Sequence, residues 1–455
     1  MRTYKIELAV HLLICLSLVL SPQSPASPGP RQTTPTNDAA PVTPDKTVST
    51  TQTNTKVERD TTTNIQPQLT ASPGVQGIHT SSKNLSFLLD PAIYHAIPQD
   101  EIPKPFRRPL SNPHRSQSSE SLIAQIDTLL ADGDFAGTAH FSALCLTSPF
   151  LRSTDTVLIF ELLSVRYTCL ELLGQKNLAA REAKALEDLT STFYYDAVEV
   201  DEKTIEAHAG QQALPVHIVP FELRVQATRL QSIAFDDRRR FITALYELGF
   251  ECRDYIASPY TSSEDREIWR TRLSSLGLQV VNSLIDLGEF DCAERLISEQ
   301  LLEDKSQEPI WVCRNMLLLM KMGKVAEAEK QINKIQAHTD KLIIQAILAT
   351  AADDLEEADA LLTGAVKDAG ESTLTAVAKQ SLAINCLYRG RISDAQEILE
   401  GLVIQGSAPR SSITILATIF ELRSDKSQAQ KELLAEQIAA SSQAKKVFSN
   451  SDLKL

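Results

Sequence analysis

The sequence predicts an all-α protein built from stacked helical hairpins. The chain is rich in Ala and Leu, whereas only 5% of its residues are aromatic, and β-sandwiches and barrels depend more on Val, Thr, Tyr and Phe. Apolar residues recur at helical spacing, as in Leu276, Val280 and Leu287, which places them on one face of a helix. Strand patterns are sparse, and prolines on both sides of Val216 to Val219 oppose a strand there.

The prolines divide the chain into an irregular arm and a folded body. Fifteen of the 21 prolines fall between Pro22 and Pro113, and 455 residues are too many for one compact core. The body is therefore expected to run from residue 119 to residue 455. Residues 21–83 are mostly Ser, Thr, Pro, Gln and Asn, which bury too little apolar surface to offset the entropy cost of ordering. This arm is predicted to be disordered.

The first 20 residues have the form of a secretory signal peptide. Arg2 and Lys5 precede an apolar run from Leu8 to Leu20, and small residues follow. A helix of this length rises only about 20 Å, which is too little to cross a membrane. Two interpretations stay open. In the first, residues 1–26 act as a signal peptide that directs the chain into the secretory pathway, and the arm is a glycosylated stalk. In the second, the run is only a hydrophobic terminus and the arm is a tether.

A proline-rich strip with apolar residues follows the arm at residues 84–108. Its four prolines forbid a continuous helix, so the strip is expected to lie extended along a groove of its own chain or of a partner. An unstructured linker is the competing interpretation. The candidate partner-docking residues are Phe87, Tyr94, Ile97 and Phe106.

A turn of the form Gly-x-apolar-x-x-Ala recurs in the second half of the chain. Its copies contain Gly288, Phe290 and Ala293, then Gly323 and Ala328, then Ala358 without the glycine, then Gly390 and Ala395, with weaker copies at Gly133 and Gly174. The alanines are 35, 30 and 37 residues apart, and their mean spacing of 34 is the tetratricopeptide period. Glycine lets the chain leave a helix in a left-handed conformation, and alanine lets two helices approach closely. We therefore predict a tetratricopeptide-like α-solenoid.

Charge and motifs exclude several functions. A net charge of −13 opposes binding to nucleic acid. The sequence lacks the GxxxxGK[ST], HExxH, GxSxG and GxGxxG motifs, and its seven cysteines form no CxxC pair. We therefore expect no catalytic residue, no cofactor, no metal site and no small-molecule substrate. The cysteines are expected to be buried thiols in a reducing compartment, and the run Arg238–Arg240 a solvated helix face or, alternatively, a contact for an acidic partner or a membrane.

Four blocks of the body, in order, carry a resemblance to a known family. They are Ile218–Arg224, Ile268–Leu273, Ser381–Ile392 and Ile415–Ser424, with Leu453–Leu455 closing the chain. With these blocks the chain resembles subunit 12 of the trafficking protein particle (TRAPP) complexes, a tetratricopeptide protein. The likeness spans residues 155–455, and the strip at residues 87–108 is more faintly similar to a segment that precedes the repeats in fungal members.

The resemblance implies a non-catalytic scaffold of TRAPP III. That complex activates a Rab-type GTPase on membranes between endoplasmic reticulum and Golgi and in autophagy, and the exchange activity belongs to other subunits. The implied partners are the other TRAPP subunits and, indirectly, the GTPase and the membrane surface. The implied location is the cytoplasm, peripheral to ER and Golgi membranes, which a working signal peptide would contradict. The alternatives are a generic tetratricopeptide adaptor and a secreted, stalked repeat protein.

Overall fold

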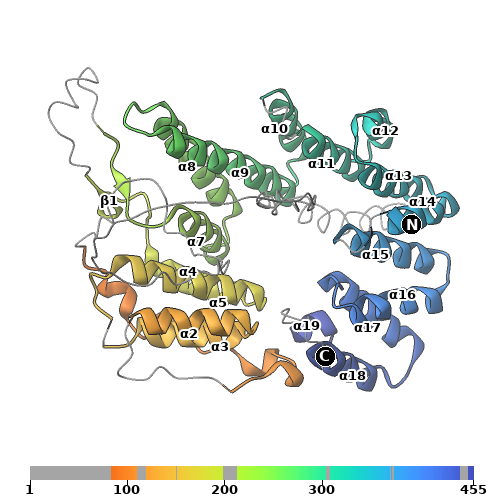
Figure 1. The fold of residues 1–455 in the computed structure, drawn as a ribbon, viewed down its shortest axis with the longest axis horizontal. Coiled ribbons are helices and arrows are strands. Elements are labelled where there is room, and N and C mark those ends of the chain that lie inside the picture. The colour runs from red at the N-terminus through yellow and green to blue at the C-terminus, as the bar shows by residue number, and fades with distance from the viewer. Residues whose placement is uncertain are drawn as a thin grey trace, which may run out of the picture. The chain divides into compact units, whose positions relative to one another are not determined.

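The structure, a computed structural model, describes residues 83–109, 119–149, 151–197, 213–303, 308–368, 370, 373–440 and 449–455. The hydrophobic segment 1–20 and the arm up to residue 82 lie outside these residues, so the expectations for them stay predictions. Helices dominate the part described, and its one sheet is a pair of very short strands (Figure 1). The all-α prediction is confirmed.

The helices follow one another along the described part of the body. In the first half they are α2 (Ser119–Ala131), α3 (Phe135–Leu146), α4 (Thr156–Leu172), α5 (Lys176–Ala183), α7 (Phe221–Ala234), α8 (Arg238–Ala257) and α9 (Ser263–Leu287). In the second half they are α10 (Phe290–Glu303), α11 (Glu308–Lys321), α12 (Val325–Gln331), α13 (His338–Ala352), α14 (Leu355–Asp368), α15 (Thr373–Tyr388), α16 (Ile392–Ile404), α17 (Arg410–Arg423), α18 (Ser427–Ala440) and α19 (Asn450–Leu453). The 3₁₀ helices are η1 (Ser86–Leu89), η2 (Gln99–Glu101), η3 (Lys104–Phe106), η4 (Lys184–Leu186), η5 (Thr192–Tyr194) and η7 (Ile332–Lys334).

Helices that are neighbours in sequence pack on one another. The most extensive contacts join α3 to α4, α5 to α7, α8 to α9, and each of α13, α14 and α15 to the helix that follows it (Figure 1). The buried apolar side chains form clusters that succeed one another along the chain, from one around Phe160 to one around Leu416. Packing is therefore mainly local in sequence.

Left-handed residues end the first helix of four successive hairpins. Gly288 has a φ of 81° after α9, and the N–H of Glu289 donates to the carbonyl oxygen of Leu284 at 2.9 Å, which satisfies a carbonyl group at the end of the helix. Gly323 after α11 and Gly390 after α15 repeat this geometry with φ of 80° and 76°. At the turn where the sequence lacks glycine, Asp353 adopts the left-handed conformation with a φ of 72°.

The alanine of each turn is inaccessible to solvent. Ala293, Ala328, Ala358 and Ala395 all have an exposed fraction of 0%. Each belongs to the second helix of its hairpin, and Ala293, Ala328 and Ala395 are members of apolar clusters. A larger side chain at these positions has no room, because the interior is close-packed. The weaker copies also turn left-handed, with φ of 70° at Gly133 and 81° at Gly174.

The expectation that no strand forms at Val216 to Val219 was wrong over two residues. β2 (Val216–His217) pairs in antiparallel register with β1 (Tyr195–Asp196), and Tyr195 lies opposite His217. Proline carries no N–H to continue a ladder, so Pro215 and Pro220 confine the pairing to this short stretch. The strands join the segment after η5 to the start of α7.

Candidate functional site

The strip at residues 84–108 lies on the chain's own first helices. Leu85 and Leu88 expose 0% and 1% of their surface and belong to the same apolar cluster as Phe141 of α3 and Phe160 of α4. The N–H of Leu85 donates to the carbonyl oxygen of Ser153 at 2.8 Å. The strip is thus an ordered part of the body and contributes to its core.

The four residues singled out in the strip differ in burial. Ile97 is buried, Tyr94 and Phe106 are half-buried, and Phe87 is 39% exposed, with its ring edge-on to Phe193 at 6.0 Å between centroids. The Tyr94 hydroxyl donates to the carbonyl oxygen of Leu88 at 2.5 Å. The most deeply buried side chains, Leu85 and Leu88, were missed because their spacing in a short proline-rich segment shows no period.

A buried ion pair holds the middle of the strip. Arg166 on α4 donates from Nε to Oε2 of Glu182 on α5 at 2.6 Å, and the two side chains expose 1% and 0% of their surface. Arg166 also donates to the carbonyl oxygens of Ala139 and His95, at 2.6 Å and 3.0 Å. The N–H of His95 donates to Oε1 of Glu182 at 3.0 Å. Both backbone polar groups of His95 are therefore satisfied by the same ion pair.

The guanidinium of Arg166 also faces an aromatic ring. It lies 5.4 Å from the centroid of Tyr94, within the range of a cation–π interaction. Burial and the carboxylate of Glu182 raise the pKa of Tyr94 far above its ordinary value, so the phenol stays neutral and remains a donor. These contacts hold α4, α5 and the strip together.

The far end of the strip contacts the last helices of the chain. Phe106 packs against the cluster that contains Leu416 and Leu434 as well as against the first cluster. The side-chain amide of Asn450 donates to the carbonyl oxygen of Asp100 at 2.6 Å. The strip therefore touches both the beginning and the end of the helical body.

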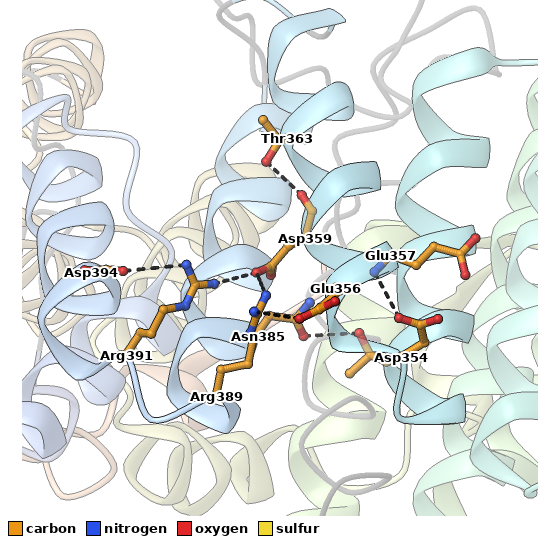
Figure 2. A network of polar contacts seen from close by, with 10 residues as sticks. Asp354, Glu356, Glu357, Asp359, Thr363, Asn385, Arg389, Arg391 and Asp394 are labelled. Carbon is orange, nitrogen blue, oxygen red and sulfur yellow. Dashed lines mark hydrogen bonds and ion pairs between the residues drawn. The ribbon is translucent and has the colours of Figure 1, made fainter.

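Three helices in the second half meet in a network of charged groups (Figure 2). Asp359 of α14 accepts hydrogen bonds through Oδ2 from Arg389 at 2.8 Å and from Arg391 at 2.5 Å. The two arginines flank Gly390, whose left-handed turn directs both of them to one carboxylate (Figure 2). Arg389 also reaches Glu356 at 3.3 Å, and Arg391 reaches Asp394 at 3.6 Å. The network ties one hairpin to the turn of the next.

Four of the buried cysteines are held in the thiol form. Burial raises the pKa of Cys145, Cys169, Cys252 and Cys313 to about 12, so these thiols are not thiolates at neutral pH. Cys386 is also buried. The expectation of a buried thiol was wrong for Cys292, which is exposed because the adjacent Ala293 takes the inward position on α10.

His217 is the histidine whose surroundings most affect its charge among the described residues. Its Nε2 donates to the carbonyl oxygen of Leu189 at 2.9 Å, and its Nδ1 accepts from the N–H of Val219 at 3.0 Å, which fixes a neutral tautomer. Burial and the nearby Arg224 lower its pKa to about 4. The side chain serves the strand pair and is occupied on both ring nitrogens.

Among the described residues, no group of three or more His, Cys, Asp or Glu side chains is placed to hold a metal ion. In the same part of the chain, no helix combines the length and the apolar character needed to cross a membrane. The arginines of Arg238–Arg240 are all exposed, as expected for a solvated helix face.

No protein-family model and no curated protein matches this sequence. The resemblance of the four sequence blocks to subunit 12 of the TRAPP complexes stays a prediction.

Proposed function

We propose that this chain is a non-catalytic tetratricopeptide-like α-solenoid that acts as a scaffold for other proteins. The observation that carries the proposal is the turn after α9, α11, α13 and α15. In each case a left-handed residue is followed, five positions later, by an alanine that solvent does not reach. Repeated hairpins that pack mainly on their neighbours are typical of solenoids, whose use is to present extended binding surfaces.

The proposed assembly is a TRAPP III-type tethering complex that acts in traffic between endoplasmic reticulum and Golgi and in autophagy. The four blocks named above support this proposal, and one of them contains an exposed apolar residue. Leu422, within Ile415–Ser424, is 71% exposed, although Leu416 and Phe420 of the same block are buried. Its side chain is therefore accessible to a neighbouring subunit, and its place within one of the four blocks makes it the residue to test for such a contact. The GTPase exchange reaction would belong to other subunits.

Affinity purification of the tagged full chain from its native organism tests the proposal. At low salt, the small TRAPP core subunits should be recovered in near-equal amounts with the tagged chain. The chain offers a matched pair of variants for locating the contact. Leu422→Ser should reduce recovery of a partner at least several-fold, whereas Ile404→Ser, at a position 80% exposed and outside the four blocks, should leave it unchanged.

The outcomes separate the proposals. If no TRAPP subunit is recovered at low salt, the assignment to that complex is wrong. If other proteins are recovered with the natural chain and not with the Leu422→Ser variant, the chain is a scaffold for a different assembly. Turnover of a substrate by the purified chain would contradict the non-catalytic role. Removal of the first ~26 residues together with a mobility shift on deglycosylation would favour the secreted alternative.

A further inference from the structure

A cavity of about 690 Å³ lies among the described helices α5, α7, α8, α9, α10 and α11. Its lining is strongly basic although the whole chain carries a net charge of −13. The basic lining residues are Lys176, Arg229, Arg238, Arg314 and Lys321, and Asp286 is the acidic one. The local excess of positive charge is therefore opposite in sign to that of the protein.

Arg314 is the buried member of this set. It lies on α11 with an exposed fraction of 7%, and its guanidinium is 4.9 Å from the centroid of the Trp311 ring. Burial lowers the pKa of Arg314 to about 10, because a buried positive charge has lost much of its hydration. An anion in the cavity would offset that loss, since a buried charge is stabilised by an opposite charge and by hydrogen bonds.

The other cations surround the cavity from different helices. Lys321 is half-buried and lies 5.5 Å from the centroid of the Phe290 ring. Arg238 donates to the carbonyl oxygen of Asp286 at 3.4 Å. Arg229 forms an ion pair with Glu171 at 2.6 Å, so its charge is partly compensated. Within the described residues, Lys176, Arg238 and Lys321 form no ion pair with a carboxylate at 4.0 Å or less.

We propose that this cavity binds a compact ligand bearing several phosphate groups, either a free inositol phosphate or the headgroup of a phosphoinositide. A guanidinium group can donate two parallel hydrogen bonds to two oxygens of one phosphate group. The neutral side chains of Ser232, Gln279 and Asn282 add further hydrogen-bonding groups. A cavity of this size is in the range of about 300–1,000 Å³ that holds small molecules. Several cations converging on one cavity favour a ligand whose charge is concentrated rather than spread along an extended peptide.

Trp311 provides a reporter inside the proposed site. The chain has two tryptophans, so a Trp269→Phe background leaves Trp311 as the single emitter beside Arg314. Titration of the full chain with inositol hexakisphosphate at 0.15 M salt should change the Trp311 emission with saturation. The apparent affinity should fall as salt rises, because ionic contacts are screened.

Matched charge variants test the location. Arg238→Gln combined with Lys321→Gln should weaken the binding at least tenfold. Arg270→Gln is the control, because Arg270 is exposed, pairs with Glu267 and lies on the part of α9 that does not line the cavity. An unchanged melting temperature, followed by circular dichroism, shows that a variant is folded. If the double variant melts at a lower temperature than the natural chain, the single variant Lys321→Gln takes its place.

Vesicles distinguish the two sources of phosphate. Phosphatidylcholine vesicles with 5% of a bisphosphorylated phosphoinositide should pellet the chain if the ligand is a lipid headgroup, and vesicles of equal charge made with phosphatidylserine should not. Binding of inositol hexakisphosphate without binding to the phosphoinositide vesicles supports a free inositol phosphate as the ligand. Three results would overturn the proposal: no binding in either arm, equal weakening by Arg270→Gln, or an acidic peptide that binds more tightly than the inositol phosphate. The inference is independent of the scaffold role, because co-purification of partners does not require it.

Discussion

Glu182 on α5 accepts hydrogen bonds from Arg166 on α4 at a point where neither side chain is accessible to solvent. The same pair binds the N–H and the carbonyl oxygen of His95, a residue 71 positions before Arg166. Taking two charges out of water is costly, and the cost is offset only if all their hydrogen-bonding groups are satisfied. The strip completes that set of hydrogen bonds. The strip therefore helps to make burial of the ion pair possible.

Removing one partner of this pair should be strongly destabilising. Glu182→Gln leaves a buried arginine without its counter-charge, and we expect a loss of about 3–5 kcal/mol in the free energy of unfolding. Arg270→Gln, which breaks the exposed pair with Glu267, should change stability by no more than about 0.5 kcal/mol. Urea unfolding measures both. Amide hydrogen exchange of residues 85–106 should also accelerate in Glu182→Gln, and an unchanged rate there would show that the strip does not depend on the pair.

Leu88 and its neighbour Phe87 offer a direct test of which strip residues are anchors. Leu88→Ala removes a side chain that is 1% exposed, so we expect a loss of about 2–5 kcal/mol. Phe87→Ala removes a larger side chain that is 39% exposed and has one edge-on contact, so the loss should be below about 1.5 kcal/mol. Equal losses in urea unfolding, or a larger loss for Phe87→Ala, would show that Phe87 and not Leu88 is the main anchor of the strip.

The strip shows what the sequence could not predict. Phe87, Tyr94, Ile97 and Phe106 were the candidate docking residues, but the most deeply buried side chains of the strip are Leu85 and Leu88. The pairing of Arg166 with Glu182 joins two helices, and neither residue belongs to a periodic pattern or a motif. Such contacts depend on which side chains tertiary packing brings together, and one sequence contains no local signal for them.

The turns show what the sequence could predict. A left-handed conformation is a property of a few residues, so glycine at Gly288, Gly323 and Gly390 could be interpreted locally. The same reasoning did not identify Asp353, although aspartate is among the residues that tolerate this conformation. Steric preferences of the backbone can therefore be inferred from the sequence, whereas a residue that departs from them, such as Asp353, is identified only in the structure.

Two glycines of one hairpin should respond to alanine in opposite directions. Gly390→Ala places a Cβ on a backbone with a φ of 76°, and because no neighbouring atom lies within 4 Å, the expected cost of about 1–2 kcal/mol is purely conformational. Gly401→Ala lies inside α16, where the added Cβ also meets nothing within 4 Å, and should stabilise by about 0.5–1 kcal/mol. Urea midpoints that shift in the same direction for both variants would contradict the assigned turn.

The carboxylate of Asp359 should be energetically coupled to Arg389. A double-mutant cycle with Asp359→Asn and Arg389→Gln is expected to give a coupling of about 0.5–2 kcal/mol that decreases at high salt, because both side chains are only partly exposed. Glu356→Gln is the matched control. That carboxylate also reaches Arg389 but is 86% exposed, so its coupling should be close to zero. Equal coupling for the two acids would show that burial of Asp359 does not matter.

His217 should make stability depend on pH in the acid range. Its pKa is about 4 in the folded chain against an ordinary value of 6.5, so between these values the unfolded chain binds the proton and the folded chain does not. The contribution of neutral His217 is therefore complete above pH 6.5 and is lost as pH falls toward 4, by a total of about 3 kcal/mol.

The control for this effect is His217→Gln, which cannot be protonated. Its stability should be lower than that of the natural chain at pH 7, because glutamine does not reproduce both ring hydrogen bonds to Leu189 and Val219. The difference between the two proteins should then shrink as pH falls from 6.5 to 4.5, since only the natural chain has a histidine at position 217 whose protonation stabilises the unfolded state. Urea unfolding at several pH values, at low protein concentration because the pI is near 5.2, measures this difference. Parallel curves for the two proteins would mean that His217 is protonated in the folded chain as easily as in the unfolded one.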